Sequence, residues 1–452
     1  MVKGGLRKKV HLVAVNMGYG HERPAFALRH LAVKEKIVIA NDYPGIPRRD
    51  RGYWETSRKW YERISRAKRI PIIGETAFRI MDEMQSIPEF YPRRDLSKPN
   101  MQLREFYYLI RHRKFMRHLI EKLAADPKPL ICTFMVPAFA AEELGYPGEI
   151  YVVVTDADIS RTWAPLHPMQ SRIKYFASNR RVQQRLQLYG VREENIMLTG
   201  FPLPDEAIGG EGMPTIREDL SRRFCGLDPK GNFIFDHLPA LEEAFGSAFA
   251  AQLKNRCKPH PVSITFAVGG AGAQRELGVT IAKSLSCLMN EGKIKLNLVA
   301  GTRPDVAEFF SRELKKIGCS ASLRRGDVRV LFEKDHPTYF KAFGELIRKT
   351  DVLWTKPSEL CFYTGLGVPI IMAPPIGSQE KFNHRWLEEV GGGVAMLDPR
   401  YTNEWLMDMI DSGALARMAW NGYVEAPTFG TYRIGEIVQG KKIDLHDLPL
   451  VV

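Results

Sequence analysis

The chain has 452 residues, more than one ordinary hydrophobic core of about 250–300 residues accommodates, so we expect two domains. Its hydrophobic content of 44% and aromatic content of 10% are typical of a folded protein and exclude a disordered chain. Lys and Arg total 65 against 52 Asp and Glu, and this net charge of +13 indicates an acidic partner such as nucleic acid, an anionic membrane face or a phosphorylated ligand.

The N-terminal residues and the cysteines indicate the compartment. No run approaches the roughly 20 apolar residues that a membrane-spanning helix needs, and the N-terminus lacks a signal-type cleavage site, so we expect a cytoplasmic protein. The cysteines form no Cys-x-x-Cys pair and most have apolar neighbours, which predicts buried thiols rather than disulfides or zinc ligands. They are Cys132, Cys225, Cys257, Cys287, Cys319 and Cys361.

Short apolar runs alternate with helical stretches along the whole chain. The first series is VHLVAV (10–15), KIVIA (36–40), PLICTF (129–134), IYVVVTD (150–156), IKYFAS (173–178) and NIMLTG (195–200). The second series is SITFAVGG (263–270), IKLNLVAG (294–301), VRVLF (328–332), DVLWTK (351–356), PIIMAPP (369–375) and GGVAML (392–397). Near-continuous apolar strands between helices predict an α/β protein with two doubly wound, Rossmann-like parallel sheets.

A change of amino-acid composition between the two series of apolar runs marks a domain boundary. Gly and Pro cluster over 200–215 and again over 254–262, with a Phe-rich helical stretch between them. The predicted parts are a first Rossmann-like domain (1–205), a connecting region (206–260), a second Rossmann-like domain (261–425) and a C-terminal segment (426–452) that packs back on the first domain. Because doubly wound sheets bind ligands beyond the carboxyl ends of their strands, we expect the site in a cleft between the domains.

Basic and aromatic residues gather in the first half of the chain. Residues 48–69 combine Arg and Lys with Trp54, Trp60 and Tyr61, and residues 104–125 have the spacing of one helix with an apolar side. Two interpretations remain open: solvated helices packed on the sheet, or a surface that attracts anionic lipid with about 1 kcal/mol per basic residue. Nucleic acid is not the expected partner, because the sequence has no zinc-finger, RNP-type or helix-turn-helix pattern.

The first predicted strand ends in the loop NMGYGHERPAFAL (16–28), which brings a histidine to the start of a helix. Gly18 and Gly20 allow a sharp turn around Tyr19, and the N–H groups of the first helical turn suit an anion or a polar substrate. The positive end of the helix dipole disfavours the imidazolium form of His21 by about 0.3–1 kcal/mol, so the side chain stays neutral, as a general base must. A structural cap is the alternative role of His21.

A dinucleotide site is a rival interpretation of this loop. Asp42 follows the second predicted strand about twenty residues on, where a ribose-binding acid would lie. Arg23 stands in place of the third glycine, so the fingerprint is incomplete.

Two loops of the second series have the composition of a phosphate and sugar site. Gly269, Gly270 and Gly272 lie between a strand and a helix, and glycines ahead of a helix N-terminus form a ready pyrophosphate site. The Gly-Lys-Ser/Thr ending of a P-loop is missing, which argues against an ATPase or a kinase. A polar cluster further on is either a ligand site or a solvated helix start, and it consists of Gln379, Glu380 and Asn383.

Together these segments resemble the GT-B glycosyltransferases of the MurG and monogalactosyldiacylglycerol synthase type over nearly the whole chain. In chain order they are the Gly-x-Gly-His loop (18–21), VVVTDADISRTW with Asp156 and Trp163, NIMLTGFPLP, the glycine loop at Gly269, TKPSE and PPIGSQEKFN. The order and spacing of these segments carry the resemblance.

The resemblance implies a GT-B fold and an inverting, metal-independent hexosyl transfer from a nucleotide-sugar, expected to be a UDP-sugar, without a separate cofactor. By resemblance His21 is the catalytic base, a role that typically contributes 10²- to 10⁴-fold. Gly18, Tyr19, Gly20 and Asp156 belong to the acceptor side. The expected acceptor is a lipid or another hydrophobic hydroxyl compound, reached at the inner face of the membrane.

On the donor side, the resemblance places the diphosphate at the N–H groups around Gly270 and Gly272, in the loop that opens at Gly269. The sugar and the neighbouring phosphate are expected to contact the polar cluster of Gln379, Glu380 and Asn383.

Two departures from the family affect the donor site. Family members usually have Lys-Pro-Gly-Gly where this chain has KPSE (356–359), and a ribose-binding Glu near the position of Thr364. Glu359 is the candidate to take over the ribose contact. The alternative function is that of a catalytically inactive GT-B relative that binds a membrane or nucleic acid through its basic residues.

Overall fold

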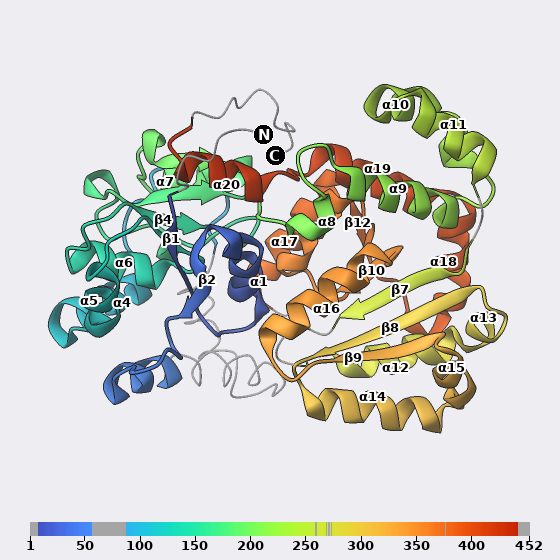
Figure 1. Cartoon of the computed structure of the whole chain (residues 1–452), viewed down its shortest axis with the longest axis horizontal. Coiled ribbons are helices and arrows are strands. Elements are labelled where there is room, and N and C mark those ends of the chain that lie inside the picture. The colour runs from blue at the N-terminus through green and yellow to red at the C-terminus, as the bar shows by residue number, and fades with distance from the viewer. Residues whose placement is uncertain are drawn as a thin grey trace. The chain divides into compact units, whose positions relative to one another are not determined.

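The computed structural model describes residues 8–56, 87–257, 260–267, 269, 272, 274–375 and 377–441. The chain divides into two compact units, each a parallel sheet flanked by helices (Figure 1). The first unit comprises Met1–Leu203, Ile376–Asn383 and Phe429–Val452, and the second comprises Pro204–Pro375 and His384–Thr428. None of the described helices has the length and apolar content that crossing a bilayer requires.

The first unit contains a six-stranded sheet in which neighbouring strands run parallel. Its strands are β1 (Val10–Ala14), β2 (Ala32–Ile39), β3 (Leu130–Cys132), β4 (Ile150–Val153), β5 (Lys174–Ala177) and β6 (Ile196–Leu198). They lie in the order β2-β1-β3-β4-β5-β6, so the carboxyl ends of all the strands meet at one edge. The strands coincide with the apolar runs of the first series, because Val, Ile and Leu suit strands that are buried on both faces.

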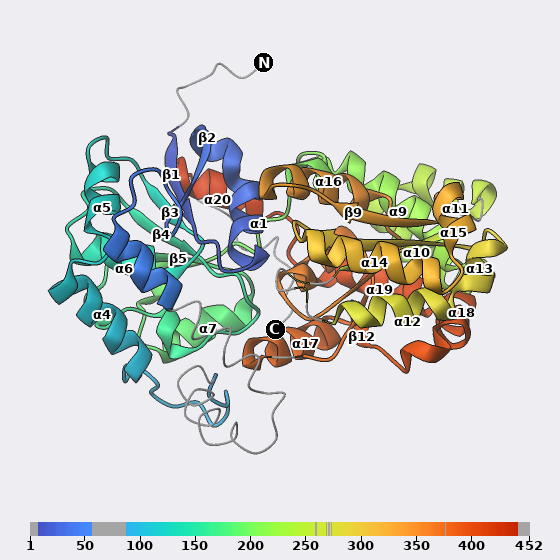
Figure 2. The same ribbon diagram turned by 90° about the horizontal axis from the view of Figure 1, so that it is seen from below.

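Helices cover both faces of this sheet. They are α1 (Tyr19–Leu28), α4 (Met101–Arg113), α5 (Arg117–Ala124), α6 (Met135–Glu143), α7 (Arg180–Leu188) and α20 (Gly430–Val438). On one face, Leu12 packs with Leu28 of α1 and Ile434 of α20. On the other face, Val13 packs with a cluster that includes Ile110 of α4 and Phe139 of α6. Figure 2 shows α1 and α20 on the opposite side of the sheet from α4, α5 and α6.

The single helix predicted for residues 104–125 is wrong, because the segment forms two helices. Lys114 and Met116 have left-handed φ values of 52° and 66°, and they separate α4 from α5. Between them Phe115 is 2% exposed, and the buried carboxylate of Asp50 accepts a hydrogen bond from the Met116 N–H at 3.1 Å. Burial of Phe115 and the contact with Asp50 outweigh the helical periodicity at the break.

The second unit also contains a six-stranded sheet in which neighbouring strands run parallel. Its strands are β7 (Val262–Ala267), β8 (Ile294–Gly301), β9 (Val328–Phe332), β10 (Val352–Thr355), β11 (Ile370–Met372) and β12 (Gly393–Ala395). Their order is β12-β11-β10-β7-β8-β9. The prediction of an α/β protein with two doubly wound parallel sheets is therefore confirmed.

The described helices of the second unit are α8 (Asp205–Ile208), α9 (Pro214–Leu227), α10 (Asn232–Phe245), α11 (Ser247–Arg256), α12 (Arg275–Ser284), α13 (Ser286–Asn290), α14 (Pro304–Lys316), α15 (Ser320–Arg325), α16 (His336–Arg348), α18 (Thr402–Asp411) and α19 (Ala414–Glu425). Helix α17 (Ser378–Val390) begins among residues of the first unit and ends among those of the second. The fully buried guanidinium of Arg223 fastens α9, because it donates to the carbonyl groups of Thr350, Leu366 and Ile347.

The prediction that all six cysteines are buried thiols is wrong for three of them. Cys225 at the end of α9 and Cys257 after α11 form a disulfide, with a Cα–Cα distance of 5.2 Å. Cys287 is exposed, whereas Cys132, Cys319 and Cys361 are buried thiols. The disulfide arises because α10 and α11 fold back as a pair, which brings two cysteines 32 residues apart into contact.

Candidate active site

His21 lies in the first turn of α1, just beyond the carboxyl end of β1. Its Nδ1 atom is 2.9 Å from the carbonyl oxygen of Thr133 and 3.3 Å from the hydroxyl oxygen of Thr155. The Thr133 hydroxyl in turn donates to the His21 carbonyl group at 2.6 Å. Thr133 and Thr155 follow β3 and β4, which come next to β1 in the sheet, so the strand order brings the three residues together.

These contacts decide which nitrogen of His21 carries the proton. A carbonyl oxygen can only accept, so the 2.9 Å contact with Thr133 requires a proton on Nδ1. In the neutral ring the basic lone pair then lies on Nε2. The contact with Thr133 therefore makes Nε2 the nitrogen that accepts a proton.

Aromatic rings surround His21. The ring of Phe134 lies 4.8 Å from that of His21, and Trp163 lies at 6.3 Å. Trp54 extends the cluster, at 6.4 Å from Phe134 and 5.3 Å from Phe115. Trp54 is only 5% exposed, so it belongs to the core of the first unit and not to a membrane-facing surface. Trp60 and Tyr61 of the same basic segment lie outside the described residues.

The two glycines of the loop have different roles. Gly18 has a φ of +108°, which favours glycine, and it makes the sharp turn ahead of α1. Gly20 lies within the first turn of α1, so the prediction that it contributes to the sharp turn is wrong. Tyr19 between them points inward: it is 8% exposed, and the Arg23 guanidinium lies 5.9 Å from the centre of its ring.

Asp156 and Asn383 meet at the carboxyl end of β4. The Asn383 amide donates to Oδ1 of Asp156 at 3.2 Å and accepts from the Ala157 N–H at 2.8 Å. Asn383 is 1% exposed, so its amide connects α17 to the loop after β4. Gln379 and Glu380 lie half-buried at the start of the same helix. Asp156 is therefore brought together with a residue more than 200 positions away, and contact of this cluster with a sugar stays a prediction.

In the second unit, the glycine loop after β7 forms a tight turn. The Gly272 N–H donates to the Gly269 carbonyl group at 2.9 Å, and Gly272 has a φ of +66°. A Cβ atom at Gly272 would lie 2.9 Å from Val306, so this position leaves no room for a side chain, whereas one at Gly269 would lie 2.7 Å from Cε of Lys356 and would displace only the end of that flexible side chain. Gly270 lies outside the described residues.

Two cations flank this glycine turn. Lys356 follows β10 and Arg303 follows β8, the two strands on either side of β7. The ammonium group of Lys356 lies 3.6 Å from the Cβ position of Gly269, and Cζ of Arg303 lies 4.0 Å from that of Gly272. Arg303 also binds Asp305 at 3.0 Å, and this hydrogen bond holds the pKa of Asp305 below its ordinary value. The turn therefore combines backbone N–H groups with positive charge, which suits a diphosphate.

Thr364 lies in a tightly packed part of the second unit. It is fully buried in the 3₁₀ helix Glu359–Leu366, and its hydroxyl donates to the Gly392 carbonyl group at 3.4 Å. A Cβ atom at Gly392 or at Gly422 would collide with this hydroxyl, so the surroundings leave no room for a glutamate side chain. Glu359 is 8% exposed at the start of the same helix. Nucleotide contacts of both residues stay predictions.

Sequence reasoning missed Thr155 and Arg303. Thr155 lies within VVVTD and Arg303 follows IKLNLVAG, so both stand directly after a predicted strand. A strand end identifies them as candidates, but their importance depends on strand order, which places Thr155 beside His21 and Arg303 beside Gly272.

Comparisons with known protein families and sequences cover limited parts of the chain. Residues 320–436, about a quarter of the chain, match a domain of unknown function (DUF6938). A processive diacylglycerol β-glucosyltransferase of Bacillus pumilus is 38% identical over 72 residues, which cover 14% of this chain and 19% of the relative. The match thus spans about a fifth of that relative's length.

Solved structures with a similar course of the chain include a MurG of Acinetobacter baumannii, at 14% identity over 96% of this chain and 99% of that protein, with a TM-score of 0.46. A UDP-N-acetylglucosamine 2-epimerase of Neisseria meningitidis aligns at 12% identity over 77% of this chain and 84% of its own, with a TM-score of 0.43. The MurG and the 2-epimerase have different activities according to their names. Their likeness to this chain therefore concerns the fold and does not indicate which reaction it catalyses.

Proposed function

We propose that this chain is a GT-B glycosyltransferase that moves a hexosyl group from a UDP-sugar to the hydroxyl group of a lipid. The observation that carries the proposal is the contact between Nδ1 of His21 and the Thr133 carbonyl oxygen, which leaves Nε2 as the basic nitrogen. The name of the B. pumilus relative, a diacylglycerol β-glucosyltransferase, supports a lipid acceptor and a hexosyl donor.

In the proposed step, Nε2 of His21 takes the proton of the acceptor hydroxyl while the acceptor oxygen attacks the anomeric carbon of the donor. The bond between that carbon and the diphosphate oxygen breaks, and the nucleoside diphosphate leaves with the electron pair. Attack from the side opposite the leaving group inverts the anomeric configuration.

The donor diphosphate is proposed to bind at the glycine turn of the second unit. N–H groups at the turn and at the start of α12 are donors for its oxygens, and Lys356 and Arg303 supply positive charge beside Gly269 and Gly272. These groups neutralise the charge that develops on the leaving diphosphate, so the proposed reaction needs no metal. Gln379, Glu380 and Glu359 are the proposed contacts to the sugar and the ribose.

Helix α4 is the proposed contact with the membrane that holds the acceptor. Met101, Arg104 and Tyr108 recur at the spacing of one helical face, and Met101 and Tyr108 are 67% and 45% exposed, whereas Arg111 on the same face is paired with Glu143 at 2.6 Å. Exposed apolar and aromatic side chains on either side of Arg104 suit an anionic bilayer surface, where the aromatic ring lies at headgroup depth. Peripheral attachment at the cytoplasmic face is therefore part of the proposal.

The disulfide offers a test of the compartment. Disulfides are rare in the cytosol, so a cytoplasmic protein is expected to keep Cys225 and Cys257 reduced in cells. Alkylation of cell extracts followed by mass spectrometry reports the state of this pair. Full oxidation in growing cells would contradict the cytoplasmic location.

Thermal-shift measurements with a panel of sugar nucleotides test the donor site. A matching UDP-sugar at a hundred times its Kd is expected to stabilise the protein by about 2.7 kcal/mol. UDP alone is the matched control for the nucleotide part. Stabilisation by none of the sugar nucleotides would contradict the proposal and favour an inactive relative that binds membranes or nucleic acid.

A further inference from the structure

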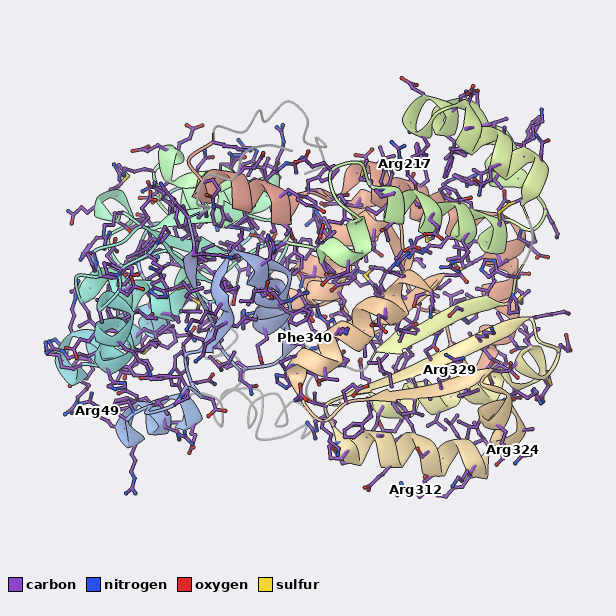
Figure 3. The ribbon with its side chains drawn as sticks, viewed as in Figure 1. Arg49, Arg217, Arg312, Arg324, Arg329 and Phe340 are labelled. Carbon is purple, nitrogen blue, oxygen red and sulfur yellow. A yellow bond between two sulfur atoms is a disulfide. The ribbon has the colours of Figure 1, made fainter. Side chains whose placement is uncertain are left out.

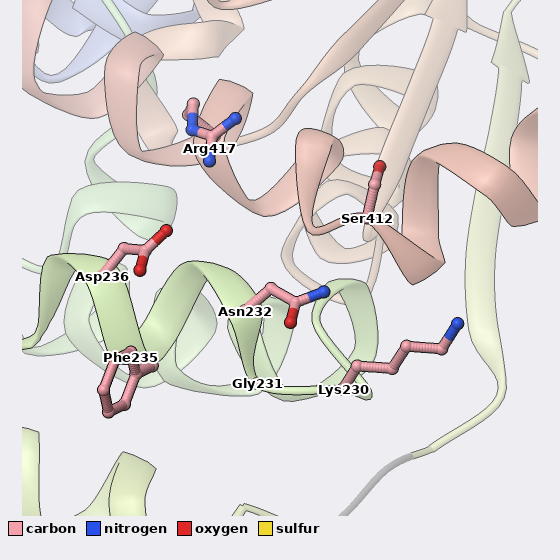
Figure 4. Close-up of a pocket in the computed structure, with 7 residues that line it drawn as sticks. All are labelled: Lys230, Gly231, Asn232, Phe235, Asp236, Ser412 and Arg417. Carbon is pink, nitrogen blue, oxygen red and sulfur yellow. The ribbon is translucent and has the colours of Figure 1, made fainter.

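A pocket of about 590 Å³ lies on the second unit, between the start of α10 and the connection from α18 to α19 (Figure 4). Lys230, Asn232 and Asp236 form one wall, and Ser412 and Arg417 form the other. The volume falls within the range of about 300–1,000 Å³ that is typical of small-molecule sites. The proposed sugar transfer uses none of these residues.

One wall of this pocket is held in place by Asp411. Its carboxylate binds the Lys230 ammonium group at 2.9 Å, and its carbonyl group accepts from the Asn232 amide at 3.2 Å. Asp228, which is 3% exposed, accepts from the Ile234 N–H at 2.9 Å and fixes the turn that leads into α10. Lys230 and Asn232 are therefore positioned before any ligand arrives.

Asp236 and Arg417 point toward each other from opposite walls (Figure 4). Within the part of the chain that the structure describes, neither side chain makes a hydrogen bond or an ion pair. A carboxylate only accepts and a guanidinium only donates, so a ligand between them must present donors and acceptors on neighbouring atoms. Adjacent hydroxyl groups of a sugar ring satisfy both side chains at once.

The charge of the pocket argues against a phosphate ligand. Lys230 and Arg417 are offset by Asp236 and by Asp411, and the buried carboxylate of Asp228 lies close behind the wall, beside Gly413. Without surplus positive charge, a neutral polyhydroxyl ligand is favoured over an anion.

Phe235 also lines the pocket, at its edge on α10. It is 84% exposed, and its ring projects from α10 away from Arg417 (Figure 4). An exposed aromatic face packs well against the C–H face of a sugar ring. In a ligand longer than one ring, the ring that follows the one between Asp236 and Arg417 therefore packs against Phe235 at the pocket edge.

We infer that this pocket binds a neutral oligosaccharide, with one sugar ring between Asp236 and Arg417 and the next ring against Phe235. This inference goes beyond the proposed transfer reaction, because the site is separate from the donor and acceptor residues. It gives the protein a second means of holding a glycan, independent of catalysis.

Saturation-transfer NMR on the full chain tests this inference, with maltotriose, cellotriose and triacetylchitotriose as probes at millimolar concentration. At least one probe is expected to bind, and Asp236→Asn and Arg417→Gln are expected to weaken it about tenfold, since each removes a charged hydrogen-bonding group. Phe235→Ala is expected to weaken the binding of the trisaccharides and to leave the binding of a single sugar ring unchanged. Arg312→Gln is the matched control, because Arg312 is 62% exposed on α14 and does not line the pocket; Figure 3 labels its position.

Three outcomes would overturn the inference: none of the trisaccharides binds, the Asp236 and Arg417 variants bind as tightly as the control, or inorganic phosphate or glutamine displaces the glycan. Sugar-nucleotide stabilisation measured on the same variants separates this inference from the proposed function. If glycan binding fails while UDP-sugars still raise the melting temperature, only the oligosaccharide pocket is contradicted.

Discussion

The two halves of the chain differ sharply in net charge. The proposed phosphate site does not lie in the more basic half. Residues 1–203 hold 35 Lys and Arg against 21 Asp and Glu, whereas residues 204–452 hold 30 against 31. The glycine turn flanked by Lys356 and Arg303 nevertheless lies in the second, nearly neutral half. Net charge governs long-range attraction to a surface, while a phosphate is held by a few groups at one sheet edge. The basic half thus suits the proposed membrane acceptor, and the neutral half suits the donor.

The largest effect is expected from His21→Ala, which removes the proposed base from the first unit. Turnover should fall 10²- to 10⁴-fold while the donor Kd changes less than twofold, because His21 is not among the proposed donor contacts. Steady-state kinetics and calorimetric titration with the donor measure the two quantities. His167→Ala, an exposed histidine of the same unit, is the control. Turnover retained by His21→Ala would remove the base assignment.

The disulfide gives a test that concerns the second unit alone. In protein oxidised after purification, Cys225→Ser is expected to lower the free energy of unfolding of that unit by about 3–4 kcal/mol, because the bond closes a loop of 32 residues. Calorimetry should show a lower transition for the second unit and an unchanged one for the first, and reduction of the wild type should reproduce the shift. Cys287→Ser, at an exposed thiol, is the matched control. An equal shift of both transitions would show that the units do not unfold separately.

Lys356→Met tests whether the glycine turn, and not the net charge of the second unit, attracts the donor. Loss of the ammonium group beside Gly269 is expected to weaken UDP-sugar binding about 10- to 100-fold, or about 1.4–2.7 kcal/mol, with little change in kcat. Lys349→Met removes an equal charge from an exposed position of the same unit and should leave the Kd unchanged. Equal weakening by both variants would mean that net charge, and not the glycine turn, attracts the nucleotide.

The smallest effect is expected from Thr155→Val in the first unit. The 3.3 Å contact with Nδ1 of His21 is a weak hydrogen bond, so its loss should cost about 0.5–1.5 kcal/mol and lower kcat about 2- to 10-fold at constant KM. Thr155→Ser keeps the hydroxyl group and should restore turnover. ¹⁵N chemical shifts of the His21 ring should still report the proton on Nδ1, since the Thr133 carbonyl group remains. A proton on Nε2 in the wild type would contradict the assigned tautomer.

The strands could be predicted from sequence far better than the contacts between them. Apolar runs with β-branched residues located the strands of both sheets, because doubly buried strands leave a strong local signal. The break between α4 and α5 left no such signal, since it depends on Phe115 entering the core and on Asp50 accepting from Met116. The pairing of Cys225 with Cys257 likewise depends on how α10 and α11 fold back.

The same contrast holds for the candidate site. The glycine pattern around His21 and Gly269 was visible in the sequence, because sharp turns and close approaches require glycine. Arg303 lies in no motif, and Thr155 lies in the VVVTDADISRTW segment without being a candidate residue, so strand order brought both beside those loops. The expected contact of Asn383 with the donor stays a prediction, and its hydrogen bonds to Asp156 and Ala157 could not be predicted from the sequence. Residue type predicts the candidates, and topology decides their neighbours.

The most direct test of the central claim is NMR of the product formed from UDP-α-glucose and diacylglycerol vesicles in the presence of EDTA. Single displacement assisted by His21 predicts a β-glucosyl lipid, formed without metal and absent with His21→Ala. If diacylglycerol is a poor acceptor, a whole-lipid extract with the UDP-sugar that gives the largest thermal shift replaces the pair. An α-linked product, or no transfer by a protein that binds the donor, would contradict the account.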